Sequence, residues 1–187
     1  MLIFMGFGLG LSFLLLRRDP DLLASRLTVT PLAEPTLEQK IIQCASSVLF
    51  VAMLLSCGLD VRWHGPRFPV WAVLLADLSV LSGGWLLHLV FKANRYAAAI
   101  VRVQTGQTVI DSGPYAVLRH PMYAWAMIFF LATPPALGSL WGFAPALLTC
   151  GVIVARLLGE ERYLRANLPG YAEYCAKVRW RLIPRIW

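Results

Sequence analysis

Residues 121–155 read PMYAWAMIFFLATPPALGSLWGFAPALLTCGVIVA, a run of 35 residues without a charged side chain. In its middle, TPPALGS (Thr133 to Ser139) combines paired prolines with a glycine, a pattern typical of a tight turn. Each half is near the length that crosses a bilayer, and in lipid every backbone polar group must be paired internally. We therefore predict a helical hairpin of segments 121–137 and 139–158 whose ends return to one side of the membrane.

The composition of the whole chain favours an integral membrane protein. Of its 187 residues, 58% are hydrophobic and 14% are charged, whereas soluble domains contain roughly 25% charged residues. A soluble domain of this length cannot bury so much apolar surface. The net charge of +7 would suggest nucleic acid for a soluble protein. Here the charges flank apolar runs, so membrane topology explains them first, and we expect no nucleic-acid partner.

Three further apolar segments precede the hairpin, at 1–16, 41–59 and 69–91. The first resembles the core of a signal peptide. However, no basic residue precedes it and LLLRRDP is a poor cleavage site, so we interpret it as a short membrane helix. The predicted fold class is all-α, a polytopic membrane protein with about five transmembrane helices.

The positive charges predict an orientation. Lys and Arg concentrate in 17–40, in 92–120 and in the part that begins at Arg156, which together hold 15 of the 17. Loop 60–68 holds the other two. The positive-inside rule then places the N-terminus outside and the C-terminus in the cytoplasm, and we expect a bacterial inner membrane.

Local signals predict where some helices begin and end. Thr36 with Gln39 three residues later forms a capping-box pattern before the second span. NLPGY (167–171) is expected to divide the tail into two short helices. We expect neither a disulfide framework nor a metal site, because the cysteines form no CxxC pair. These cysteines are Cys44, Cys57, Cys150 and Cys175.

The longest polar stretch between spans is 94–123. Irregular backbone near membrane depth must be buried in protein or line a wet cavity. Pro121 suits the first turn of a helix, which places His120 at the entrance, where free N–H groups favour anionic ligand groups. The alternative is an interfacial anchor, with Arg119 serving topology alone. This stretch by itself favours neither interpretation. Candidate cavity residues are Gln104, Thr105, Gln107 and Thr108.

Two charged residues near the end of the last span favour the pocket. Arg156 and Glu160 are spaced i, i+4 and share one helix face. The hairpin brings that helix end beside His120, so we expect a pocket for a polar, charged ligand next to lipid. Asp77 and His88 in the third span lie roughly 16 Å apart along their helix. For this pair a structural and a functional role both stay open.

Three motifs make the chain resemble the isoprenylcysteine carboxyl methyltransferase family of integral membrane enzymes. They are TVIDSGPYAVLRHPMYAW, RLLGEERYL and LPGYAEYCAKVRWRLIPRIW, and the resemblance covers about 94–187. It implies a cytosolic S-adenosylmethionine pocket and a lipophilic acceptor that enters from the membrane. It also implies a methyltransferase core at 94–187, with the helices of 1–93 shaping acceptor access in one integrated domain.

The resemblance assigns roles by matching position. Arg156 matches a catalytic residue on the acceptor side, and Gln107 departs from the histidine found in the eukaryotic enzymes. The implied cofactor contacts are Gln104, Gln107, Thr108, Val109, Ile110, Tyr115, His120, Pro121, Met122, Tyr123 and Glu160.

The chemistry of these side chains suits that cofactor. Glu160 suits its ammonium or a ribose hydroxyl, His120 suits its carboxylate, and aromatic faces attract a cation such as the sulfonium. Arg156 is well shaped to hold an anionic acceptor. Positioning and desolvation can supply much of the rate without a general base.

Two alternatives remain. Membrane sterol reductases, which use NADPH, end in a similar stretch, here YAEYCAKVRWRLIPRIW, but are usually longer. A non-catalytic membrane subunit is the other. The identity of the acceptor does not follow from the sequence.

Overall fold

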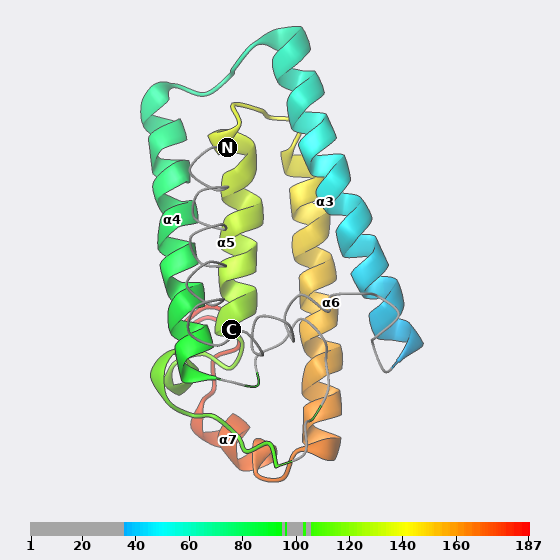
Figure 1. Ribbon diagram of the computed structural model, residues 1–187, viewed down its shortest axis with the longest axis vertical. Coiled ribbons are helices and arrows are strands. Elements are labelled where there is room, and N and C mark those ends of the chain that lie inside the picture. The colour runs from blue at the N-terminus through cyan, green and yellow to red at the C-terminus, as the bar shows by residue number, and fades with distance from the viewer. Residues whose placement is uncertain (1–35, 95, 97–102, 104–105) are drawn as a thin grey trace, which may run out of the picture.

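Four helices stand side by side, and a shorter one lies across one end of them (Figure 1). The computed structural model describes residues 36–94, 96, 103 and 106–187. Segment 1–16 therefore lies outside the described residues. No strand occurs within the described ranges, which confirms the all-helical fold class. The elements are α3 (Leu37–His64), α4 (Val70–Ala93), the 3-10 turn η2 (Gly113–Ala116), α5 (Pro121–Ala136), α6 (Phe143–Asn167) and α7 (Tyr171–Lys177).

Helices α3, α4 and α6 are long and apolar enough to cross a membrane. Their outward faces carry large apolar side chains such as Val48, Trp71 and Leu148, each more than half exposed. Such faces are unfavourable in water and favourable in lipid. The chain is therefore an integral membrane protein. The shorter α5 spans 16 residues.

The four long helices pack in the order α4, α5, α6, α3 (Figure 1). Between α4 and α5 the approach is close, because a Cβ added at Gly83 would collide with the indole of Trp125. Between α3 and α6 the contact is made by Met53, Cys57 and Ala146, all buried. The close contacts hold α5 and α6 side by side in the centre, as the predicted hairpin requires.

The carboxylate of Asp60, fully buried near the end of α3, anchors the turn between α5 and α6. Its Oδ2 accepts hydrogen bonds from the Ser139 hydroxyl (2.8 Å) and from the backbone nitrogens of Leu140 (2.8 Å) and Trp141 (3.1 Å). Arg67 Nε lies 3.5 Å from Oδ1. A buried charge is tolerated only when it is paired in this way. The predicted hairpin thus has its turn tied to α3.

The paired prolines do not form the turn, contrary to our expectation. Pro134 and Pro135 lie inside the last turn of α5, and the connection runs through 137–142. Proline lacks only the amide donor, and both carbonyls still accept bonds, from Ser139 N (2.9 Å) and Gly138 N (3.0 Å). The prolines therefore close α5 instead of reversing the chain.

The last span is longer than predicted. Helix α6 continues past residue 158 to Asn167, because charged side chains at a helix end that leaves the membrane do not interrupt its hydrogen bonds. Gly170 then adopts φ 81°, a left-handed conformation that glycine accepts without strain, and α7 begins. The predicted division at 167–171 is real. However, the first of the two expected short tail helices is the end of α6.

The predicted start of α3 is confirmed. Thr36 is the N-cap, and its hydroxyl oxygen accepts a hydrogen bond from the backbone nitrogen of Gln39 at 3.2 Å. The side chain of Gln39 does not complete a capping box. Instead it is buried and accepts a hydrogen bond from Arg156 on α6.

Candidate functional site

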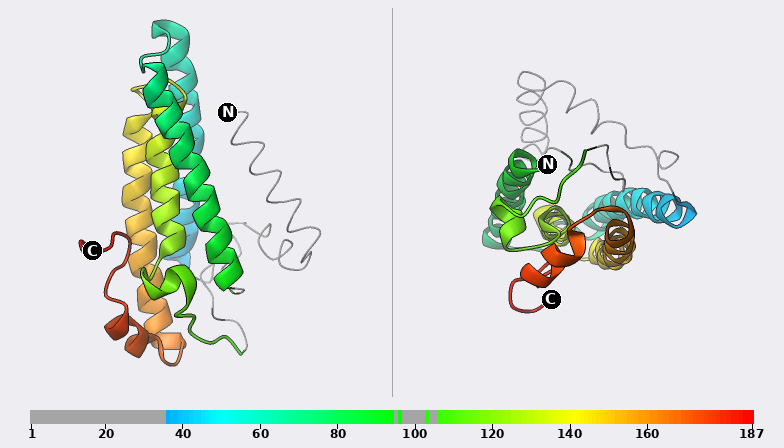
Figure 2. Two further views of the ribbon diagram at one scale, coloured as in Figure 1. Left: turned by 90° about the vertical axis from the view of Figure 1, so that its left-hand side faces the viewer. Right: turned by 90° about the horizontal axis from the view of Figure 1, so that it is seen from below.

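The start of α5 and the last turns of α6 lie at the same end of the bundle (Figures 1 and 2). Residues of both segments line a cavity there. Seen from that end, α7 lies across α5 and α6 (Figure 2). The cavity has a volume of about 90 Å³. Small-molecule sites commonly have volumes of roughly 300–1,000 Å³. A ligand of nucleotide size would therefore extend out of the cavity through its open mouth.

Most of the predicted cofactor contacts lie together around this cavity. Gln104 lies outside the described residues. Pro121 lines an apolar groove on another side of the same segment, together with Leu86, Leu89 and Leu118. The predicted residues that do line the cavity are Gln107, Thr108, Val109, Ile110, Tyr115, His120, Met122, Tyr123 and Glu160.

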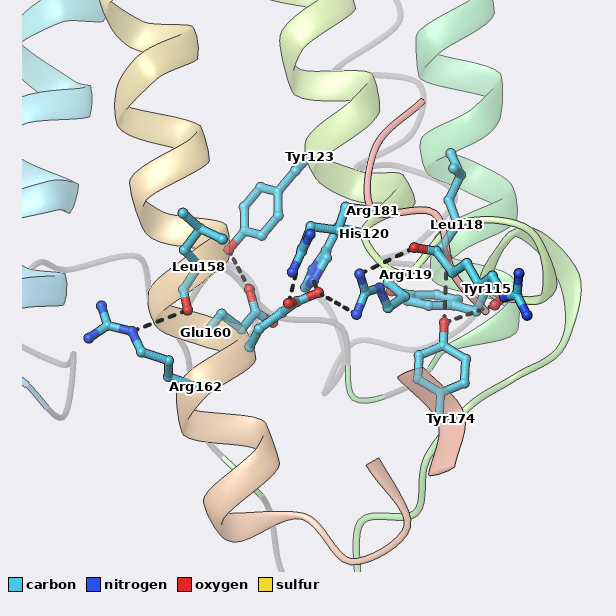
Figure 3. A network of polar contacts seen from close by, with 12 residues as sticks. Tyr115, Leu118, Arg119, His120, Tyr123, Leu158, Glu160, Arg162, Tyr174 and Arg181 are labelled. Carbon is cyan, nitrogen blue, oxygen red and sulfur yellow. Dashed lines mark hydrogen bonds and ion pairs between the residues drawn. The ribbon is translucent and has the colours of Figure 1, made fainter. Parts of the chain in front are cut away.

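A buried ion cluster forms one side of the site. Glu161, only 4% exposed, contacts two arginines and a histidine. Its Oε1 lies 3.2 Å from Arg119 Nη1 and 3.2 Å from His120 Nε2, and its Oε2 accepts from Arg181 Nε at 3.1 Å. Figure 3 shows Arg119, His120 and Arg181 converging from different segments. The cluster joins α6, the entrance of α5 and the C-terminal tail.

The C-terminal tail reinforces this arrangement through the backbone. Arg119 N donates to Trp180 O (2.8 Å), and His120 N donates to Arg181 O (3.0 Å). Arg181 also lies over the ring of Trp187, with 5.2 Å to the centroid. The tail thus fixes the backbone on which His120 is carried. Arg181 and Trp187 of the terminal motif therefore have a structural role, because they contact each other and Arg181 contacts Glu161.

Arg119 belongs to the site, which corrects our interpretation of it as a topological anchor. Its side chain is 7% exposed, lines the cavity and pairs with Glu161. Burial of a guanidinium requires such a carboxylate partner. Sequence reasoning missed this role because the partner lies 42 residues away, on another helix.

A chain of polar contacts leads from the cavity to α3. Tyr123 Oη donates to Glu160 Oε2 at 2.6 Å and accepts from Arg156 Nε at 3.1 Å. Arg156 Nη1 donates to Gln39 Oε1 at 3.3 Å. Arg156 does not itself line the cavity but contacts the Tyr123 hydroxyl there. It is therefore placed between the cavity and the α3–α6 interface.

Two buried donors at the cavity are without a hydrogen-bond partner in the described part of the chain: the hydroxyl of Tyr171 and Nε of Arg119. Buried polar groups are normally satisfied. Both residues line the cavity. Their unused donors suit a ligand that carries hydrogen-bond acceptors.

Sequence reasoning assigned no site role to several residues of the lining. Tyr171 and Tyr174 stand in the motif LPGYAEYC, which carried the family resemblance, so their spacing on one face of α7 was a usable signal. Asp77 and His88 do not line the cavity, and His88 packs against Trp85. The unassigned lining residues are Asn94, Tyr96, Arg119, Leu164, Leu168, Tyr171 and Tyr174.

Comparison with known proteins adds an independent finding. A family model described as phospholipid methyltransferase matches residues 71–169, just over half of the chain. A curated protein, the cobalt-zinc-cadmium resistance protein CzcN of Cupriavidus metallidurans, is 26% identical over 118 residues. The match covers 62% of this chain and 51% of CzcN, so it spans about half of that protein's length.

Proposed function

The chain belongs to the phospholipid methyltransferase family, and on that premise we propose that it transfers a methyl group from S-adenosylmethionine to a lipophilic acceptor. The family supports methyl transfer, and three apolar helices support action at a membrane. One observation carries the choice of cofactor. Glu160 of α6, the basic residues Arg119 and His120 just before α5, and aromatic side chains of α5 and α7 line a single cavity, and two of its buried donors are unused.

The chemistry of the lining fits this cofactor group by group. S-adenosylmethionine combines a sulfonium, an ammonium and a carboxylate with adenosine. The rings of Tyr115 and Tyr123 suit the sulfonium, since aromatic faces attract cations. Arg119 and His120 suit the carboxylate. Glu160 is the acceptor available for an ammonium or a hydroxyl.

When bound, the cofactor supplies an electrophilic methyl group for direct displacement by a nucleophilic acceptor. The chain's own residues bind, orient and exclude water. Tyr123 is held from both sides by Glu160 and Arg156, so its ring and hydroxyl are fixed before a ligand arrives. Preorganised positioning of this kind can lower a barrier without proton transfer. We assign no general base.

Arg156 is the residue we propose for the acceptor side. It extends from the Tyr123 hydroxyl toward Gln39 on α3 and is 6% exposed. A guanidinium matches a carboxylate or phosphate in a planar, two-point contact. An anionic acceptor group that approached from the α3–α6 side would meet it next to Tyr123. The role is proposed for an acceptor that carries such a group.

The site is proposed to face the cytoplasm of a bacterial cell, with the N-terminus outside. This orientation rests on the positive-inside distribution of Lys and Arg, 15 of which fall in the three rich regions. His120 is the N-cap of α5, and its neighbour Arg119 and the adjacent Glu161 both contact the C-terminal tail, so the cavity and the C-terminal motif lie at the same end of the bundle.

Binding to the purified protein tests the proposal. In detergent micelles, S-adenosylmethionine should raise the midpoint of thermal unfolding, and NADPH should not. Binding of NADPH alone would instead support the reductase alternative. Glu160→Ala and His120→Ala should each weaken binding, whereas Asp77→Ala, a change outside the cavity, should not. If all three variants bind equally, the chain is a non-catalytic subunit or binds elsewhere.

The acceptor can be identified without prior assumption. The protein is incubated with cofactor that carries a labelled methyl group and with a lipid extract, and the labelled product is identified by mass spectrometry. A labelled lipophilic molecule is the expected result. Label found only in water-soluble products would contradict a lipophilic acceptor.

A further inference from the structure

Tyr171, the first residue of α7, has an unused hydroxyl at the cavity. The residue is 4% exposed, and its hydroxyl has no hydrogen-bond partner within the described residues. Leaving such a group buried and unpaired costs roughly 1–3 kcal/mol. Because the ligand-free cavity does not satisfy this donor, a ligand with an acceptor atom is the natural partner.

The nearby carboxylate of Glu160 limits which ligand group fits there. Both residues line the same cavity. Burial, and then the negative charge of Glu160, raise the pKa of Tyr171 far above its ordinary range, so its hydroxyl stays protonated and remains a donor. Tyr123 occupies Oε2 of Glu160, and a carboxylate oxygen accepts more than one hydrogen bond. The same cavity therefore offers a ligand one donor, from Tyr171, and one acceptor, from Glu160.

Only some groups of S-adenosylmethionine satisfy both. An ammonium donates but cannot accept from Tyr171. A carboxylate accepts but is repelled by Glu160. Two parts of the cofactor do both: the adenine edge, whose amino group lies beside an accepting ring nitrogen, and the ribose, whose vicinal diol presents two hydroxyls together. Acidic side chains commonly bind ribose hydroxyls in nucleotide sites.

We propose that Tyr171 and Glu160 together bind the ribose diol of the cofactor, with Tyr171 donating to one hydroxyl and Glu160 accepting from the diol. This inference rests on the proposed function. It assigns Glu160 to the nucleoside part and leaves the ammonium to other contacts. It also makes α7 a specificity element for the ribose in addition to a cover for the cavity.

Tyr174 provides a matched control on the same helix. It also lines the cavity, but its hydroxyl donates to the backbone oxygen of Tyr115 at 2.8 Å. The two tyrosines thus differ in one respect that matters, since one hydroxyl is used within the protein and the other is not. Their Phe variants should separate ligand binding from stability.

The test measures unfolding midpoints of the ligand-free proteins and dissociation constants for S-adenosylhomocysteine and its 2′-deoxy and 3′-deoxy forms. Tyr171→Phe should unfold at the same or a higher temperature than wild type, because an unsatisfied group is removed. It should bind S-adenosylhomocysteine about 3- to 10-fold more weakly, the effect of one lost hydrogen bond. Tyr174→Phe should unfold at a lower temperature but keep more of its affinity.

The deoxy compounds identify the partner of the hydroxyl. For at least one of them, wild type and Tyr171→Phe should bind equally, because the group that Tyr171 contacts is missing. Equal affinity of wild type and Tyr171→Phe for S-adenosylhomocysteine overturns the inference alone. The inference is also overturned if Tyr171→Phe binds both deoxy forms more weakly than wild type by the same factor as it binds S-adenosylhomocysteine. Failure of wild type to bind S-adenosylhomocysteine or S-adenosylmethionine overturns the proposed function and this inference with it.

Discussion

The hydroxyl of Tyr123 lies 2.6 Å from Oε2 of Glu160 and donates a hydrogen bond to it, joining the first turn of α5 to α6 (Figure 3). The same hydroxyl accepts from Arg156. One phenol oxygen thus fixes both the carboxylate at the cavity and the guanidinium beyond it. This places Tyr123 at the centre of the proposed site.

Tyr123→Phe should weaken binding of S-adenosylmethionine by about 10-fold or more, since hydrogen bonds to charged groups contribute roughly 1.5–3 kcal/mol. The change removes only the hydroxyl and frees Glu160 and Arg156 from each other. Titration calorimetry on the purified protein measures the effect. Tyr163→Phe on α6, a residue outside the cavity lining, should bind as wild type does. Equal binding by Tyr123→Phe would show that this hydroxyl does not organise the site.

Glu161→Gln should destabilise the protein by about 3 kcal/mol or more, because it leaves the buried guanidinium of Arg119 without its carboxylate. The lost partner serves Arg119, His120 and Arg181. The unfolding midpoint in micelles should fall, and the rate of proteolysis in the C-terminal tail should rise. The control is Glu173→Gln, an exposed position of α7, which should change neither. A stable variant with a protected tail would contradict a structural role for the cluster.

Asp60→Asn should lower the unfolding temperature while the affinity for S-adenosylmethionine stays unchanged. The substitution removes the charge paired with Arg67 and weakens the contacts to the α5–α6 turn, a loss of about 1–3 kcal/mol. The cavity is lined by His120, just before α5, and Glu160, near the end of α6, so it lies at the other end of these helices from the α5–α6 turn. Loss of affinity in the folded variant would mean that the two ends of the bundle are coupled.

Gly83→Ala should destabilise the α4–α5 contact by about 1–3 kcal/mol, the usual cost of overpacking. The added methyl group would collide with Trp125. Gly58→Ala on α3 is the matched control, because a Cβ added there meets nothing within 4 Å. In that helix alanine should be neutral or stabilising. If the two variants unfold at the same temperature, α4 and α5 are not packed as closely as described.

Family membership confirms the resemblance that the motifs between 94 and 187 suggested. The motifs were readable because each combines residue types that a local turn or helix face requires. His120 and Pro121 mark a helix entrance, and Arg156 and Glu160 share one face. These local signals pointed to His120 and Glu160, and the family resemblance implied the other predicted residues that line the cavity.

Other partnerships were not readable because they join residues far apart in the chain. Glu161 was visible only as a neighbour of Glu160, and its three partners, Arg119, His120 and Arg181, come from two other segments. Arg119 looked like an anchor, and Gln39 looked like half of a capping box. The role of each depends on a partner on another element, Glu161 for Arg119 and Arg156 for Gln39.

The apolar tract at 121–155 by itself determined that the chain folds as membrane helices, because in lipid only internal hydrogen bonding satisfies the backbone. Local spacing determined the cap at Thr36 and the entrance at Pro121. Only the tertiary structure decided which charges pair and which donors remain unused. The hydrophobic effect is non-directional, so a run of apolar residues is enough to predict a membrane helix. Hydrogen bonds and ion pairs require distances of a few ångströms, which are set only when α5, α6, α7 and the tail pack together.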